Sequence, residues 1–89
     1  MQEIIENWII ENKYNFVVEN YGDCNDVVIC IRNKFGEYNT YDCIRIFLGD
    51  DHVLLAPSHI KLYYYSPNFL RDLKYYIDRR ITGYVDIKG

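Results

Sequence analysis

Two runs of β-branched and aromatic residues flank a glycine-containing loop in residues 27–48, VVICIRNKFGEYNTYDCIRIFL. The first run, Val27 to Arg32, consists mostly of residue types that β-sheets favour. Asn33 to Glu37 forms the loop, where Gly36 can adopt a positive φ, and Tyr38 to Leu48 returns as the second run. The stretch therefore predicts an antiparallel hairpin in the middle of the chain.

The residues before this hairpin predict a short helix and one more strand. Between Gln2 and Asn12 the apolar side chains share one helical stripe, as in an amphipathic helix: Ile5, Trp8 and Ile9. Apolar and polar residues then alternate from Tyr14 to Glu19, which is typical of a strand. The polar cluster from Tyr21 to Asp26 predicts the turn that leads into the hairpin.

The residues after the hairpin predict two short strands and a second helix. His52 to Ala56 ends before Pro57, which has no N–H to donate, and Ile60 to Tyr65 supplies the next strand. Ser66-Pro67 predicts a helix start, because serine caps helices and proline at the first position loses no needed donor. Gly83 is expected to close a helix whose apolar stripe is Leu70, Leu73, Ile77 and Ile81.

The predicted order is α-β-β-β-β-β-α, with Tyr84 to Ile87 as an optional terminal strand. Strands joined by short turns pair antiparallel, so the expected fold class is α+β, an antiparallel meander of four to five strands with a helix at each end. The 89 residues contain no linker or repeat, which predicts a single domain, 1–89.

The composition favours a globular chain in the cytoplasm of its host cell. Hydrophobic residues make up 49% and charged residues 26%, yet no apolar run is long enough to span a membrane and the N-terminus resembles no signal peptide. Three cysteines, Cys24, Cys30 and Cys43, are expected to be reduced thiols, with Cys30 and Cys43 opposite each other across the hairpin. Their spacing from the histidines matches no zinc pattern, so we expect neither a metal nor a cofactor.

The two faces of the predicted sheet differ in what covers them. One face offers a core for the helices: Phe16, Val18, Val27, Ile29, Ile31, Ile44, Ile46, Ile60 and Leu62. The other face is too apolar and aromatic for an ordinary wet surface: Val17, Val28, Cys30, Arg32, Tyr41, Cys43, Arg45, Phe47, Lys61, Tyr63 and Tyr65. A helix on each face, a second copy of the chain, or a binding partner could cover it. Tyr, Phe and Arg are the residues that interfaces favour.

Catalytic signatures are weak, so we expect no enzyme. His52 could act as a general base oriented by Asp50 or Asp51, but such short patterns are common in turns. Ser58 beside His59 lacks the glycines that frame a hydrolase nucleophile, and the five glycines form no phosphate loop.

Charge is distributed unequally along the chain and supports two opposed binding hypotheses. Residues 1–51 hold ten acidic and four basic residues, whereas residues 52–89 hold three acidic and six basic residues. The basic last helix predicts nucleic-acid binding through Arg71, Lys74, Tyr75 and Arg79. Acidic residues near turns, Glu37, Asp42, Asp50 and Asp51, could instead imitate a phosphate backbone and occupy a basic groove of another protein.

Residues 1–41 combine an opening amphipathic helix, Asn12-Lys13-Tyr14 at the start of a strand, Ile31-Arg32 at a strand end, and Glu37-Tyr38 after the glycine hairpin. In these features they resemble the small acidic anti-CRISPR proteins with which phages inhibit Cas9. The resemblance implies a phage or mobile-element protein that binds the DNA-recognition surface of a larger effector through acidic residues. The basic last helix departs from that pattern.

The favoured hypothesis is therefore a non-enzymatic inhibitor of a larger host protein, with a nucleic-acid-binding defence effector as the implied partner and a homodimer as a further expectation. Many residues with A/T-rich codons predict a low-GC bacterium or its viruses as the source. The alternative is a small nucleic-acid-binding protein that uses the basic C-terminal helix and the tyrosines of the sheet face. The predicted partner-binding residues are Glu37, Tyr41, Arg45, Phe47, Asp50, Asp51, Tyr63 and Tyr65.

Overall fold

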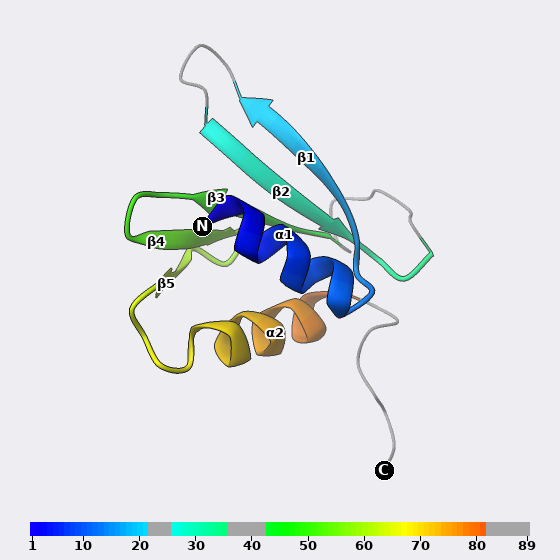
Figure 1. Cartoon of the computed structure of the whole chain (residues 1–89). Coiled ribbons are helices and arrows are strands. Elements are labelled where there is room, and N and C mark those ends of the chain that lie inside the picture. Colours follow the sequence, from blue (N-terminus) through cyan, green and yellow to red (C-terminus); the bar gives the residue numbers. More distant parts are fainter. Residues whose placement is uncertain (22–25, 36–42, 82–89) are drawn as a thin grey trace.

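A computed structural model describes residues 1–21, 26–35 and 43–81 of the chain and has the predicted α+β order. Five strands form one antiparallel sheet in sequence order (Figure 1). In the chain, one helix precedes the strands and one follows them. The elements are α1 (Gln2–Glu11), β1 (Asn15–Tyr21), β2 (Asp26–Arg32), β3 (Cys43–Leu48), β4 (His52–Ala56), β5 (Ile60–Tyr63) and α2 (Phe69–Arg80). The meander is confirmed; the optional strand from Tyr84 to Ile87 lies outside the described residues.

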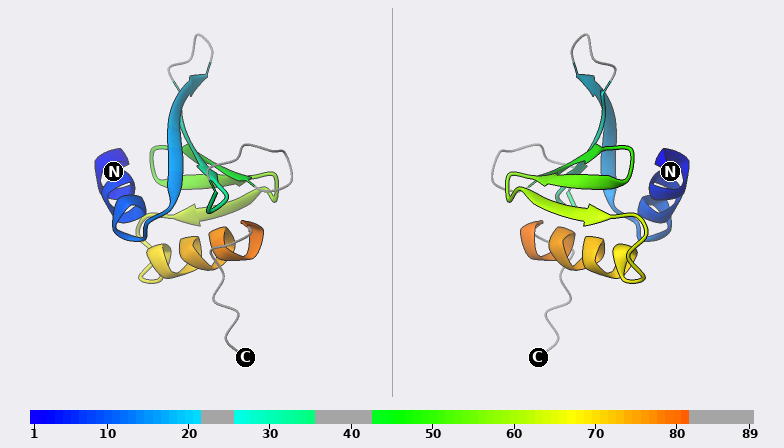
Figure 2. Two further views of the ribbon diagram at one scale, coloured as in Figure 1. Left: turned by 90° about the vertical axis from the view of Figure 1, so that its right-hand side faces the viewer. Right: turned by 90° about the vertical axis from the view of Figure 1, so that its left-hand side faces the viewer.

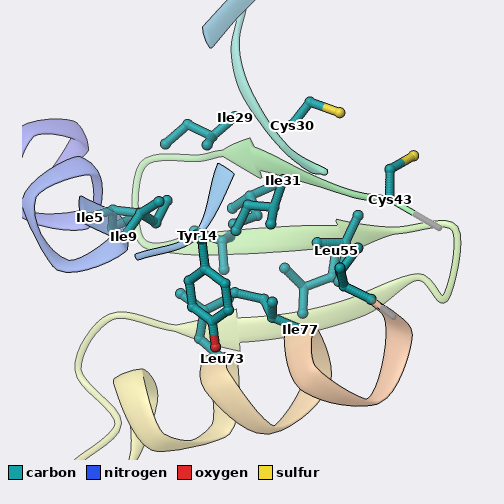
Figure 3. Packing of buried hydrophobic residues seen from close by; sticks show 14 of the residues in the cluster. Ile5, Ile9, Tyr14, Ile29, Cys30, Ile31, Cys43, Leu55, Leu73 and Ile77 are labelled. Carbon is teal, nitrogen blue, oxygen red and sulfur yellow. The ribbon is translucent and has the colours of Figure 1, made fainter. Parts of the chain in front are cut away.

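Both helices pack on the same face of the sheet. α1 lies against β1, and α2 lies against β3 and β5. Their buried residues form one cluster with the inward side chains of the strands: Ile5, Ile9, Phe69, Leu73, Ile77, Ile29, Ile31, Ile44, Ile46, Val53 and Leu55 (Figure 3). The arrangement with one helix on each face is therefore wrong, because both apolar stripes complete a single core. We call this face the helix face and the opposite one the second face.

The strand alternation assigns the faces as predicted, with two refinements. Val53 and Leu55 join the helix face and are fully buried there. Val18 lies on the same face, opposite Ile29, but its side chain is 41% exposed. The β1–β2 ribbon extends beyond the rest of the sheet, so its far end projects away from the two helices (Figure 2).

The second helix begins later than predicted. The N–H of Phe69 donates to the carbonyl of Ser66 at 3.1 Å, so Ser66 and Pro67 belong to the turn before the helix, and Asn68 is the N-cap. The buried stripe is consequently Phe69, Leu73 and Ile77. Leu70, predicted on that stripe, is exposed instead. Gly83, predicted as the helix end, lies outside the described residues.

The two described cysteines are diagonal neighbours and do not lie opposite each other as predicted. Cys30 pairs with Arg45 across β2 and β3, and Cys43 pairs with Arg32. Both thiols are free and buried, and their side chains point away from α2 (Figure 3). The hairpin register differs from the prediction by two residues, so the thiols share the second face at adjacent positions.

Candidate binding surface at the β4–β5 corner

The exposed aromatic part of the second face lies where β4 begins and β5 ends. His52 is the register partner of Tyr63, and the N–H of Tyr64 donates to the carbonyl of Asp51 at 3.0 Å. This pairing brings the β3–β4 turn beside the end of β5. We call the surface formed there the β4–β5 corner; its residues are Asp50, Asp51, His52, Lys61, Tyr63 and Tyr65.

Two tyrosines form the centre of the corner. The rings of Tyr63 and Tyr65 stack with centroids 5.2 Å apart and an interplanar angle of 29°. Tyr63 is 36% exposed and Tyr65 is 77% exposed. The Nζ of Lys61 lies 5.9 Å from the Tyr63 ring centroid. The pair thus presents aromatic surface to solvent in an orientation that the stack already holds.

An acidic turn borders the tyrosines. The carboxylate of Asp51 lies 2.6 Å from Nδ1 of His52, whose ring is 5.9 Å from that of Tyr63. This hydrogen bond is the main cause that lowers the pKa of Asp51 below its usual value, so the carboxylate is charged at neutral pH. Asp50 is exposed beside it. The corner therefore combines negative charge with aromatic rings.

The middle of the second face is more buried than predicted. Val28, Cys30 and Cys43 are almost fully inaccessible, although the helices lie on the other side of the sheet. Phe47 pairs with Val28, and Arg45 pairs with Cys30; both are partly buried. Among the described residues of the second face, the most exposed aromatic side chains are therefore Tyr63 and Tyr65 at the corner, and Phe47 and Arg45 lie inward from them on β3.

The structure therefore brings together only some of the predicted binding residues. Asp50, Asp51, Tyr63 and Tyr65 come together at the corner, while Glu37 and Tyr41 lie outside the described residues. His52, considered from sequence only as a catalytic base, joins the corner through its position opposite Tyr63. Alternation with Leu54 along β4 was the signal that could have placed it on the second face.

The Cys30 thiol is a packing group of this face. Burial raises its pKa to about 11, and the neighbouring Cys43 adds to the effect. A thiol with that pKa is protonated at neutral pH and is a poor nucleophile. The pair therefore contributes packing volume between β2 and β3.

The basic side chains of α2 are largely engaged within the molecule. Lys74 lies 3.1 Å from the carboxylate of Asp78 and donates to the hydroxyl of Tyr14 at 3.0 Å. Arg79 donates to the hydroxyl of Tyr75 at 2.9 Å. Arg71 has a longer contact, 3.8 Å, with Asp72. Binding a phosphate with Lys74 or Arg79 would compete with these contacts.

The described residues hold no group of three or more His, Cys, Asp or Glu side chains that could bind a metal ion. Neither described helix is long and apolar enough to cross a membrane. Comparison of the chain with protein-family models, with curated proteins and with solved structures found no match.

Proposed function

We propose that the chain is a non-enzymatic inhibitor that binds a larger host protein through the β4–β5 corner. The observation that carries this proposal is the exposed Tyr63–Tyr65 stack beside Asp50 and Asp51. Tyrosines bury a large area with few rotatable bonds and keep a polar hydroxyl, so they are favoured anchors of protein interfaces. A pre-stacked pair also loses little conformational entropy on binding.

The chemistry of the corner specifies the kind of surface it would bind. Carboxylates at Asp51 and Asp50 favour basic groups on the partner, and the exposed tyrosine faces can accept an arginine in a cation–π contact. A basic, nucleic-acid-binding surface of a larger protein has both properties. The resemblance of residues 1–41 to phage inhibitors makes a CRISPR effector the first such partner to test.

Nucleic-acid binding through α2 is the alternative function. It is favoured by Tyr75, which is 53% exposed and has the Arg79 guanidinium 5.4 Å from its ring centroid. The ion pair and hydrogen bonds of Lys74 weigh against it. Binding through α2 uses Tyr75, whereas the proposed protein interface uses Tyr63 and Tyr65, so substitutions separate these two surfaces.

Affinity capture from the lysate of a low-GC bacterium, with and without nuclease treatment, tests the proposal. Tyr65→Ala and Tyr75→Ala are matched variants, because each removes an exposed tyrosine ring and only one lies at the corner. We expect a protein that is retained by the wild type and by Tyr75→Ala, and released by Tyr65→Ala. Loss of capture after nuclease treatment, or with Tyr75→Ala alone, would favour the nucleic-acid alternative.

A further inference from the structure

The two edges of the sheet differ in how well they are protected. β5, at one edge, has only four residues and includes Lys61. β1, at the other edge, has seven residues, NFVVENY, with neither lysine nor proline among them. It pairs with β2 at seven consecutive positions without a bulge, and no other described strand lies on its outer side.

An edge of this kind is unusual for a stable monomer. Edge strands carry backbone N–H and C=O groups that can pair with another strand, and proteins commonly block them with lysine, proline, bulges or short length. β5 shows two of these devices, whereas β1 shows none of the four and carries a single charged residue, Glu19. The β1–β2 ribbon also extends beyond the rest of the sheet, which makes its edge accessible (Figures 1 and 2).

We propose that β1 pairs antiparallel with β1 of a second copy of this chain, which joins the two sheets across a two-fold axis. The sequence of the strand suits pairing with itself in one register. With Val18 opposite its own copy, Val17 meets Glu19, Phe16 meets Asn20, and all seven residues are paired. Val18, 41% exposed in the monomer, then packs on Val18 of the second copy.

The neighbouring registers are poorer. A shift that centres the pair on Glu19 sets two carboxylates directly opposite each other, and like charges at that distance are destabilising. A shift that centres it on Val17 leaves Asn20 and Tyr21 without partners. The charge pattern and length of β1 therefore select one self-complementary register, as a two-fold interface requires.

This dimer does not depend on the function proposed above. β1 and β5 are opposite edges of the sheet, so pairing through β1 leaves the β4–β5 corner accessible in each copy. A dimer would carry two corners, and failure of either proposal leaves the other intact.

Sedimentation equilibrium of the full chain, over a micromolar to millimolar series, tests the pairing. We expect a concentration-dependent dimer for the wild type and a monomer for Val18→Lys, since two lysines would face each other at the axis. Leu70→Lys is the control, because it exchanges another exposed aliphatic residue on α2, away from β1. A monomeric wild type, or a dimer that persists in Val18→Lys, would overturn the proposal.

Cysteine cross-linking tests the register and does not rely on Val18→Lys folding. Val18 and Asn20 are both exposed on the same face of β1, but only position 18 meets its own copy. Under mild oxidation we expect Val18→Cys to form a covalent dimer at least about 10-fold faster than Asn20→Cys, with the wild type giving the background of the native thiols. Equal rates for the two variants would rule out the proposed register.

Discussion

At the scale of single residues, Tyr14 links the two ends of the described chain. Its buried hydroxyl donates to the carboxylate of Asp78 at 2.6 Å and accepts from Lys74 at 3.0 Å. Without this hydroxyl, Asp78 and Lys74 on α2 would each lose one hydrogen-bond partner in a half-buried site. Tyr14 therefore acts as a polar anchor between the start of β1 and α2.

Tyr14→Phe is expected to lower the free energy of unfolding by about 1.5–3 kcal/mol, the range for a hydrogen bond to charged groups. Urea denaturation followed by circular dichroism measures this change. Tyr65→Phe is the control, since it deletes a hydroxyl from a side chain that is 77% exposed, and should change stability by less than about 0.5 kcal/mol. Equal effects of the two substitutions would contradict the assigned role of Tyr14.

Cys30 makes stability depend on pH in the alkaline range. Its pKa in the folded chain is about 11, above the ordinary value of 9.0, so the folded state holds the proton more tightly than the unfolded state. The stabilising contribution is complete below pH 9 and is lost as the pH rises toward 11. A loss of up to a few kcal/mol is expected for two pKa units, at about 1.4 kcal/mol each.

The measurement is the urea midpoint of the wild type and of Cys30→Ala, followed from roughly pH 8 up to the folded-state pKa of Cys30, about 11. Because tyrosines and lysines also titrate in this range, the informative quantity is the difference in slope between the two proteins. Cys30→Ala should show the shallower decline. Parallel curves would mean that burial of the thiol does not affect the pH dependence.

At the scale of elements, α2 shows what the sequence pattern predicts and what it leaves open. The i, i+4 spacing of Leu73 and Ile77 predicted the helix and most of its buried stripe. Ser66-Pro67 is a standard helix start, yet the helix begins at Phe69, because a turn at Ser66 lets the Phe69 ring reach the core. The start of α2 therefore depends on this tertiary contact, which the spacing of apolar residues in the sequence does not show.

Truncations at the start of α2 test this assignment of the buried stripe. Phe69→Ala should destabilise the chain by about 3–5 kcal/mol, since it empties a buried site in contact with the cluster. Leu70→Ala, one residue further along at the exposed position, should cost about 1 kcal/mol. Thermal unfolding of both variants gives the comparison. A larger loss for Leu70→Ala would restore the originally predicted stripe.

The sheet shows a similar division between local and tertiary information. Strict alternation assigned the inward residues of β2, β3 and β5 correctly, because one face of each strand must be apolar. Alternation could not show which face of the sheet each helix covers. An apolar stripe identifies the buried side of a helix, but not the element that it packs against. The cysteine pair was misplaced for a related reason: the register of β2 and β3 depends on the connection between them.

At the scale of the whole molecule, the candidate site depends on pairing between segments that are separate in sequence. Asp50, Asp51, Tyr63 and Tyr65 were predicted individually, but their meeting follows from the register that sets His52 opposite Tyr63. Burial of Val28 and Cys30 also emerges only from the assembled sheet. The molecule thus places its helices on one face and an acidic, aromatic corner at the opposite face.

The central claim is that the Tyr63–Tyr65 stack anchors a protein partner. Its most direct test is the dissociation constant of the captured partner for the wild type, Tyr65→Ala and Tyr75→Ala, measured by calorimetry at low and high salt. Loss of an anchoring ring should weaken Tyr65→Ala at least about 30-fold, equivalent to about 2 kcal/mol, at both salt concentrations, and leave Tyr75→Ala unchanged. Unchanged affinity of a folded Tyr65→Ala would contradict the claim.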